Sequence, residues 1–400
     1  DAINDSTIAI GPDARGSGNR SVAIGDASVA SADDAVSLGF NNLASGVNSI
    51  AIGEAASATN SNDIALGIGA DASGGNSVSI ASNSNAEGSQ SIVIGIFSNA
   101  TQTDAIAIGG SAWATNTSSI GIGADARATG DNSIAIGDGT TATNHNTISI
   151  GDGADATGTQ AIAIGVNTLS SSNDAIAIGE SADATGGNSV ALGDNAQATA
   201  SRAIAIGEIA NASTSYGIAI GYNTTASGLQ TIAIGNTTQA TQTDAIAIGE
   251  GTDATGTESI ALGSDAQSTG TGAVSLGDNA ASTGTSSVAL GEGTQASDDY
   301  TVAIGEDAIA QNAYDIAIGS DTTASGIQSI MIGSFGSVTG NTAVAVGDSA
   351  VSSGESSLAL GYNATADQDY AVAIGIGSNT DTTNQLKIGS TIQTLNTKQH

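Results

Sequence analysis

A single 14-residue period runs through this 400-residue chain, and it restricts the possible folds more than any other feature of the sequence. A glycine follows each copy of a short aliphatic motif and recurs once per period from Gly11 to Gly389, with Ala81 standing in its place once. The period gives 28 copies without insertion or deletion. Such uniform repetition is typical of a solenoid, in which each repeat stacks on the next, and not of several globular domains.

We number each repeat from its glycine, which is position 0. Positions 11 and 13 are Ile, Leu or Val in every copy, as in Ile134 and Ile136, and position 12 between them is nearly always small. Position 5 is usually Ala and position 6 is usually Ser or Thr. Apolar residues two apart follow the strand period, and a 14-residue unit rich in glycine and β-branched residues cannot form two helices. The pattern therefore predicts an all-β fold, a parallel β-solenoid of 28 coils in which each coil is one 14-residue repeat.

Alternation within the first strand of each repeat, positions 11–13, assigns its two faces. The other recurring stretch, positions 3–6, is predicted to form a second short strand. We predict that the aliphatic residues of the first strand point into the coil, opposite the small residues of the second, because large side chains facing small ones would leave no void. The predicted core then includes Ile134, Ile136, Ile162, Ile164, Ile204 and Ile206.

The small residue at position 12 would then point outward. A near-uniform Ala column has no reason to face solvent, whereas small residues let two backbones approach, so we predict that this column contacts other chains. The predicted interface comprises Ala135, Ala163, Ala177, Ala191, Ala205, Ala219, Ala233 and Ala247. Position 4 of the second strand varies freely, from Arg127 to Trp113, which indicates a solvent-facing column.

The charge balance excludes some partners. Six Lys and Arg stand against 39 Asp and Glu, giving a net charge of −33, and phosphate contacts require clusters of basic residues. We therefore expect no nucleic-acid partner. No apolar run of the length needed to cross a bilayer occurs, so we expect no membrane insertion by this segment.

The sequence contains few residues that could form a catalytic site. The only histidines are His145, in a predicted turn, and His400, so no Ser-His-Asp site is expected and the chain is not predicted to be an enzyme. Glu180, Asp194 and Glu208 follow the repeat glycine in three successive copies and are weak candidates for calcium ligands. We favour their interpretation as solvating carboxylates and expect no cofactor or metal. The aromatic residues are interpreted as scattered surface residues.

Ser-Val-Ala-Ile-Gly (21–25), Ser-Ile-Ala-Ile-Gly (133–137) and Ser-Val-Ala-Leu-Gly (287–291) resemble the head repeats of trimeric autotransporter adhesins of the YadA type. The resemblance covers about residues 7–375. It implies a left-handed β-roll, a homotrimer, and an extracellular location on the bacterial cell surface. The implied function is that of a rigid trimeric rod that attaches to host cells, extracellular matrix or another surface, through a receptor that the sequence does not name.

The last residues depart from the repeat. We therefore divide the chain into a repeat rod, 1–375, and a segment 376–400 that contains a divergent last coil and a C-terminal transition. This segment is weakly similar to the ends of phage tail fibres, which gives an alternative function as a tail-fibre segment carried by a virion or a phage-derived device. An ice-binding solenoid is a third, less favoured interpretation, because only one Thr/Ser column is present.

Overall fold

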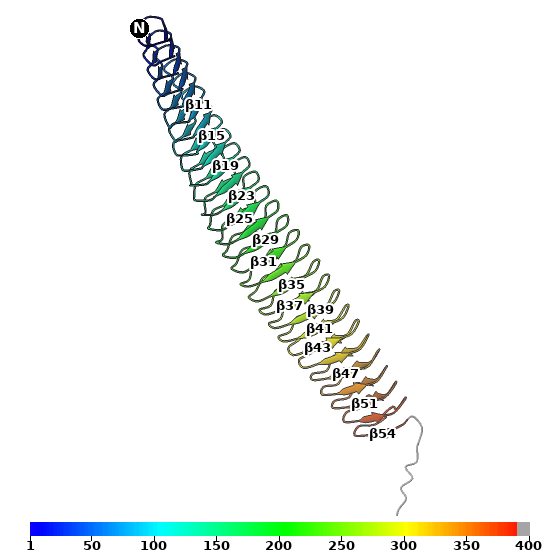
Figure 1. Cartoon of the computed structure of the whole chain (residues 1–400). Helices are drawn as coiled ribbons and strands as arrows, with labels where there is room; N and C mark the ends of the chain where they lie inside the picture. Colours follow the sequence, from blue (N-terminus) through cyan, green and yellow to red (C-terminus); the bar gives the residue numbers. More distant parts are fainter. Residues whose placement is uncertain (390–400) are drawn as a thin grey trace, which may run out of the picture. The chain divides into compact units, whose positions relative to one another are not determined.

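The computed structural model describes residues 1–389 and divides the chain into two units. The first unit is Asp1–Arg202. Its three-residue strands recur once per repeat from β1 (Ile8–Ile10) to β27 (Val190–Leu192), and its two-residue strands do the same from β2 (Arg15–Gly16) to β28 (Gln197–Ala198). One strand of each kind makes one coil, and the coils of the unit stack along one axis (Figure 1).

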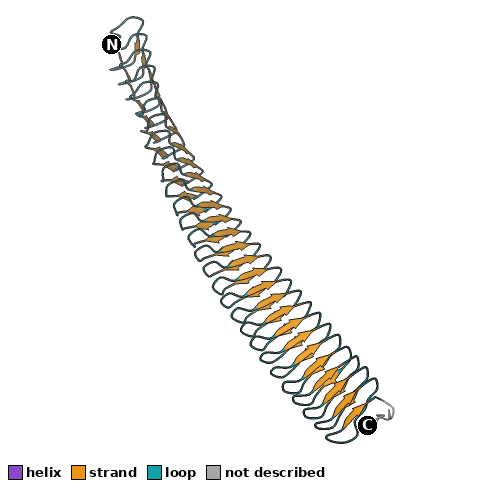
Figure 2. Cartoon of the chain, turned by 60° about the horizontal axis from the view of Figure 1, so that its bottom comes forward, coloured by secondary structure: helices purple, strands orange, loops and turns teal. Residues whose placement is uncertain are grey.

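The second unit begins at Ala203 and repeats this arrangement. Within residues 1–389 the structure contains strands and turns but no helix. Figure 2 shows the three-residue strands of each unit following one another in the same direction. The strands of the second unit keep the spacing of one repeat within these bounds: three-residue strands from β29 (Ile204–Ile206) to β53 (Val372–Ile374) and on to β54 (Leu386–Ile388), and two-residue strands from β30 (Asn211–Ala212) to β52 (Thr365–Ala366).

Within each unit, a strand pairs in parallel with the equivalent strand of the next coil, in a register offset by one repeat. Ile134 of β19 (Ile134–Ile136) lies opposite Ile148 of β21 (Ile148–Ile150). The turns are joined in the same way, since the Gly137 N–H donates to the Ile122 carbonyl at 2.8 Å. An inserted residue would break this register around a whole coil. The predicted parallel β-solenoid, with one 14-residue repeat per coil, is thus confirmed.

The two turns of each coil depend on residues in the left-handed region. Position 2 and position 9 both have positive φ, as at Asp125 (53°) and Asn132 (54°). Asn, Asp and Gly tolerate this conformation best, which explains why they recur there, while other residues lose about 1–2 kcal/mol. The turns therefore prefer small polar residues for a backbone reason, independent of solvent exposure.

The core of each coil is made of small residues. Ala135 on the first strand and Ala128 on the second are fully buried within the chain, as is Ser133. The aliphatic residues on either side of Ala135 are only half-buried. The predicted faces of the first strand are therefore wrong: position 12 points into the coil, and positions 11 and 13 point out of it.

This correction reverses both residue assignments. The predicted core side chains are half-buried residues on the outer surface of the coil: Ile134, Ile136, Ile162, Ile164, Ile204 and Ile206. The predicted interface residues are 0% exposed within a single chain and lie in its core: Ala135, Ala163, Ala177, Ala191, Ala205, Ala219, Ala233 and Ala247.

The physical reason is the narrow gap between the two strands of a coil. Met331 occupies position 12 and is fully buried, and the residue facing it is Gly336. A Cβ added at Gly336 would lie 1.9 Å from Cε of Met331. The long Met331 side chain thus lies where the opposite residue has no side chain, and the next largest side chains that are fully buried are those of Val93 and Val338. The space between the strands therefore suits small residues better than a column of Ile.

The repeat glycine is required by both its φ angle and its packing. Gly151 has a φ of 134°, and a Cβ there would lie 2.2 Å from the carbonyl oxygen of Gly165 in the next coil. Ala81 is the one described alanine in this column, and its φ is 117°. Ala81 therefore carries backbone strain that every other described coil avoids.

We predict that Ala81→Gly stabilises the fold, by about 1 kcal/mol, because the relief of strain exceeds the entropy that glycine adds to the unfolded chain. Thermal unfolding measures the change. The reverse substitution in the same column, Gly151→Ala, should lower the melting temperature. A lower melting temperature for Ala81→Gly would contradict the prediction.

Candidate functional site

One candidate surface is the outward side of the three-residue strands, which we call the aliphatic face. It consists of the Ile, Val and Leu side chains at positions 11 and 13. In-register pairing places Ile162 beside Ile176, and Ile164 beside Ile178, so each unit carries two continuous aliphatic columns. Ile178 is 38% exposed. Covering such a half-exposed side chain would contribute about 0.5–1 kcal/mol, and the gain would repeat in every coil.

The opposite surface, formed by position 4 of the two-residue strands and by position 6 just after them, is polar and variable. Position 6 is a column of Ser and Thr, in which the Thr101 hydroxyl donates to the Thr115 carbonyl at 3.2 Å. Position 4 carries the exposed Trp113, and the guanidinium of Arg127 in the next coil lies 5.7 Å from its ring centre. The predicted solvent-facing role of position 4 is confirmed for these two residues.

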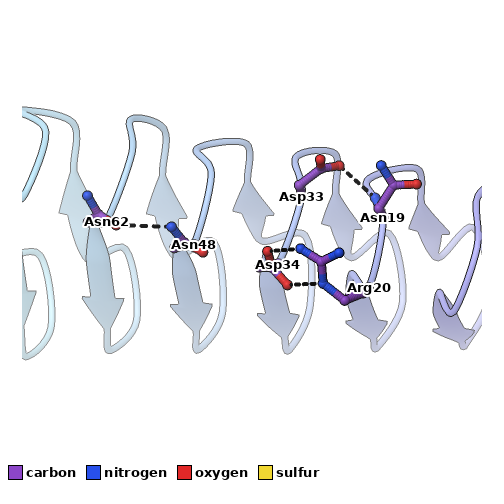
Figure 3. A network of polar contacts seen from close by, with 6 residues as sticks. All are labelled: Asn19, Arg20, Asp33, Asp34, Asn48 and Asn62. Atoms are coloured by element: carbon purple, nitrogen blue, oxygen red, sulfur yellow. Dashed lines mark hydrogen bonds and ion pairs between the residues drawn. The ribbon is translucent and has the colours of Figure 1, made fainter.

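The turn at position 9 carries side-chain ladders between successive coils (Figure 3). The Asn48 amide donates to the Asn62 side-chain oxygen at 3.3 Å. Arg20 Nε donates to Asp34 Oδ1 at 2.6 Å, and this bond holds the pKa of the Asp34 carboxyl below its usual value. Both partners are exposed, so water and salt screen the pair and it adds little to stability.

Other carboxylates tie the turns together through backbone groups. Asp33 Oδ1 accepts a bond from the Asn19 N–H of the preceding coil at 2.8 Å (Figure 3). Asp63, fully buried at position 10, accepts bonds from the Asn60 N–H at 2.8 Å and the Ser77 N–H at 2.9 Å. Sequence reasoning missed this role of Asp63 in binding backbone groups, although a carboxylate at a position filled mostly by Ser, Thr or Ala was a visible signal.

Four aspartates at position 4 have carboxyl groups with raised pKa values. Each stands on a two-residue strand, and partial burial raises the pKa of its carboxyl group above the ordinary value. The members of this set are Asp71, Asp155, Asp183 and Asp253. Asn occupies the same position in other coils, for example Asn99, so the site accepts a neutral isostere.

Comparison with protein families agrees with this geometry. The family model for the YadA head domain repeat matches in consecutive pairs of coils over most of the chain, at residues 17–42, 44–70, 86–112, 114–140, 142–168, 170–196, 198–224, 226–252, 254–280, 282–308, 310–335, 339–362 and 352–378.

The chain belongs to the YadA head-repeat family. A search of curated proteins found no match. YadA head repeats indicate a segment like those of trimeric autotransporter adhesins, whose heads form homotrimers outside the cell and bind host or surface ligands. The head repeats and the β-solenoid fold are typical of structural adhesins rather than enzymes. Among residues 1–389, no helix is long and apolar enough to span a lipid bilayer.

The acidic residues proposed as weak metal ligands lie exposed in turns of the YadA head repeats. Glu180 and Asp194 belong to the first unit and Glu208 to the second. Asp194 Oδ1 accepts a hydrogen bond from the Asn195 side chain at 2.8 Å. Across residues 1–389, no three Asp, Glu or His side chains gather in a way that could hold a metal ion. His145 lies exposed in a turn, and His400 is outside the described residues.

The structure also brings together two aromatic residues that sequence reasoning treated as scattered. Tyr300 and Tyr314 stack with their ring centres 5.1 Å apart. Both stand at position 9 of successive repeats, so their spacing of one period was the signal that could have predicted the contact.

We predict that Ala163→Leu destabilises the head repeats by about 1–3 kcal/mol, because the narrow core has no room for the larger side chain. Ile162→Leu, on the aliphatic face next to it, conserves volume and should change stability far less. Chemical denaturation of the two variants measures the difference. Equal destabilisation would contradict the corrected face assignment.

We predict that acidification stabilises the fold through the position-4 aspartates. A carboxyl whose pKa is raised on folding favours the folded state fully below its unfolded value, near 4, and this contribution is lost as the pH rises through the higher folded value. Asp155→Asn should therefore raise the melting temperature at pH 7 more than at pH 4.

The control for this experiment is Asp131→Asn, which removes one negative charge from an exposed turn. The two variants have the same net charge, so a difference between them reports the local burial of Asp155. Identical pH profiles of the melting temperature for both variants would refute the explanation.

Proposed function

We propose that this chain is a homotrimeric head segment of a bacterial surface adhesin, which holds a binding surface outside the cell and attaches it to host cells, extracellular matrix or another surface. The observation that supports the proposal most directly is the aliphatic face. Two columns of Ile, Val and Leu run along each unit, as in β23 (Ile162–Ile164) and β25 (Ile176–Ile178), and remain half-exposed in a single chain. An exposed apolar surface of this extent marks a protein interface.

The number of chains comes from the family. A closed ring in which every chain turns its aliphatic face toward a shared axis would cover that face completely. Three chains fit the homotrimers of YadA-type heads. The Ala column, already buried within each chain, has no part in this contact.

Trimerisation would leave the turns and the outer sheet accessible. Positions 4 and 6 vary or are polar, as at Trp113 and Arg127, and they can change without affecting the core. A trimer would present each of these positions three times, so weak contacts with a multivalent receptor surface would add by avidity.

We propose that a boundary between two segments lies at the end of the repeat region. Residues 1–375 would form the head segment, and 376–400 a divergent last coil followed by a transition. Within it, β54 (Leu386–Ile388) still pairs with β53, but Lys387 stands where Ala is usual, and its ammonium lies 3.5 Å from Asp381. Residues 390–400 of this segment lie outside the described residues.

Sedimentation analysis of the purified chain tests the assembly. We expect a trimer that dissociates when aliphatic residues are replaced by polar ones, as in the double variant Ile162→Ser and Ile176→Ser, because the interface loses apolar area. The control is Leu43→Ser with Leu169→Ser, which likewise replaces two aliphatic side chains by Ser, but on the opposite sheet. The control should remain trimeric.

The adhesive role is measured separately. A non-adherent bacterium displaying the trimer should attach to host cells or to a matrix-coated surface better than one displaying the Ile→Ser variant. A folded monomer at micromolar concentration would refute the aliphatic interface, and a dimer would reject the threefold arrangement. A displayed trimer that increases attachment to no surface would contradict the adhesive role.

A further inference from the structure

Two stacked tyrosines form the most distinctive exposed group in the second unit. The rings of Tyr300 and Tyr314 are nearly parallel, with an angle of 12° between their planes. The residues are 51% and 53% exposed, so their stacking leaves much of each ring uncovered. Ser286, with a short side chain, holds position 9 of the preceding repeat.

The backbone conformation gives no reason for tyrosine at these positions. Tyr300 and Tyr314 have φ angles of 59° and 64°, a region that favours Asn, Asp and Gly. Asn48 and Asn62 hold the same position in the first unit and bond to each other. A bulky, exposed side chain on a strained backbone indicates a role in recognition rather than in stability.

The two turns are rigid because carboxylates bind their backbone. Asp299 Oδ1 accepts a bond from the Thr285 N–H at 2.8 Å, and Asp298 Oδ1 accepts one from the Asp299 N–H at 2.8 Å. Asp298 and Asp299 are themselves exposed. The first tyrosine thus directly follows two exposed carboxylates in a fixed turn.

Asp315 fixes the second turn from inside. It is fully buried and accepts bonds from the Asn312 N–H at 2.9 Å and the Ser329 N–H at 2.8 Å. The first bond spans Tyr314, and the second joins its turn to the next coil. A preorganised pair of rings loses little freedom when a ligand binds.

The surrounding charge is uniformly negative. No Lys, Arg or His occurs between Arg202 and Lys387, and the whole chain has a net charge of −33. A site made of π-faces and carboxylates, with no basic residue near it in the chain, is complementary to a cation. A planar guanidinium can stack on a tyrosine ring and bond to a carboxylate at the same time.

We propose that the tyrosine pair, Tyr300 with Tyr314, and the carboxylates of Asp298 and Asp299 bind an arginine- or lysine-bearing segment of a partner protein. The basic side chain lies against the uncovered ring surface, and its charged group bonds to the exposed carboxylates. The inference rests on the proposed function, for which it names the chemistry of the partner. A trimer carries three such sites, so a basic surface would be held by several weak contacts.

Fluorescence anisotropy with a labelled Gly-Arg repeat peptide tests the inference on the full-length chain. We expect binding that weakens as salt rises, and no binding of a Gly-Glu peptide of the same length. The double variant Tyr300→Asn and Tyr314→Asn should weaken peptide binding at least tenfold. Asn suits the left-handed turn, so the melting temperature should stay the same or rise.

The matched control replaces two exposed tyrosines of the other turn, as Tyr222→Asn with Tyr362→Asn, and should bind the peptide like the unmodified chain. Equal affinity of the Tyr300/Tyr314 variant and the unmodified chain would overturn the inference. A loss of trimers in that variant would also overturn it, since the rings would then be a subunit contact.

The experiment separates this inference from the proposed function. A trimeric, adhesive chain that does not bind the peptide would overturn this inference alone. A monomeric chain that still binds the peptide through these rings would support it and overturn the proposed trimer.

Discussion

The narrow space between the two strands of a coil is the constraint on which the other properties of this protein depend. A 14-residue coil has two tight turns, so its strands lie too close for branched side chains to meet between them. Ala128, Ser133 and Ala135 fill this space, and Met331 enters it only opposite Gly336. A core of methyl and hydroxyl groups buries little apolar area per residue, so backbone hydrogen bonds between coils hold much of the structure together.

The same constraint moves the large aliphatic residues to the outside. Ile and Val favour strands because branched side chains pack well on a pleated surface. Here they lie on the side of the three-residue strands that faces away from the core, which is the aliphatic face. Two half-exposed aliphatic columns are therefore left uncovered in a single chain. In the homotrimer that we propose, further copies of the same chain would cover that face.

The turns can vary in sequence more freely than the core. Their backbone is fixed by left-handed residues and by bonds to the neighbouring coil, but the side chains at position 9 lie outside the core, as at Tyr300 and Tyr314. Asn ladders, an Arg–Asp pair and stacked tyrosines all occupy position 9 without changing the register. The exposed side chains at this position can therefore vary from coil to coil while the scaffold stays the same, which suits the attachment role that we propose.

Several features followed from the sequence alone. The 14-residue period, the strand-like alternation and the absence of insertions determined a parallel solenoid, and the motifs around Gly25 and Gly137 pointed to the head-repeat family. Alternation showed that Ala135 and its neighbours Ile134 and Ile136 face opposite sides, but a period of two is symmetric and does not say which side is inside. Only the tertiary structure decided that, because the distance between the strands sets the size of side chain that the core accepts. It also decided which turn residues meet, since Tyr300 and Tyr314 become neighbours only when successive coils stack one repeat apart.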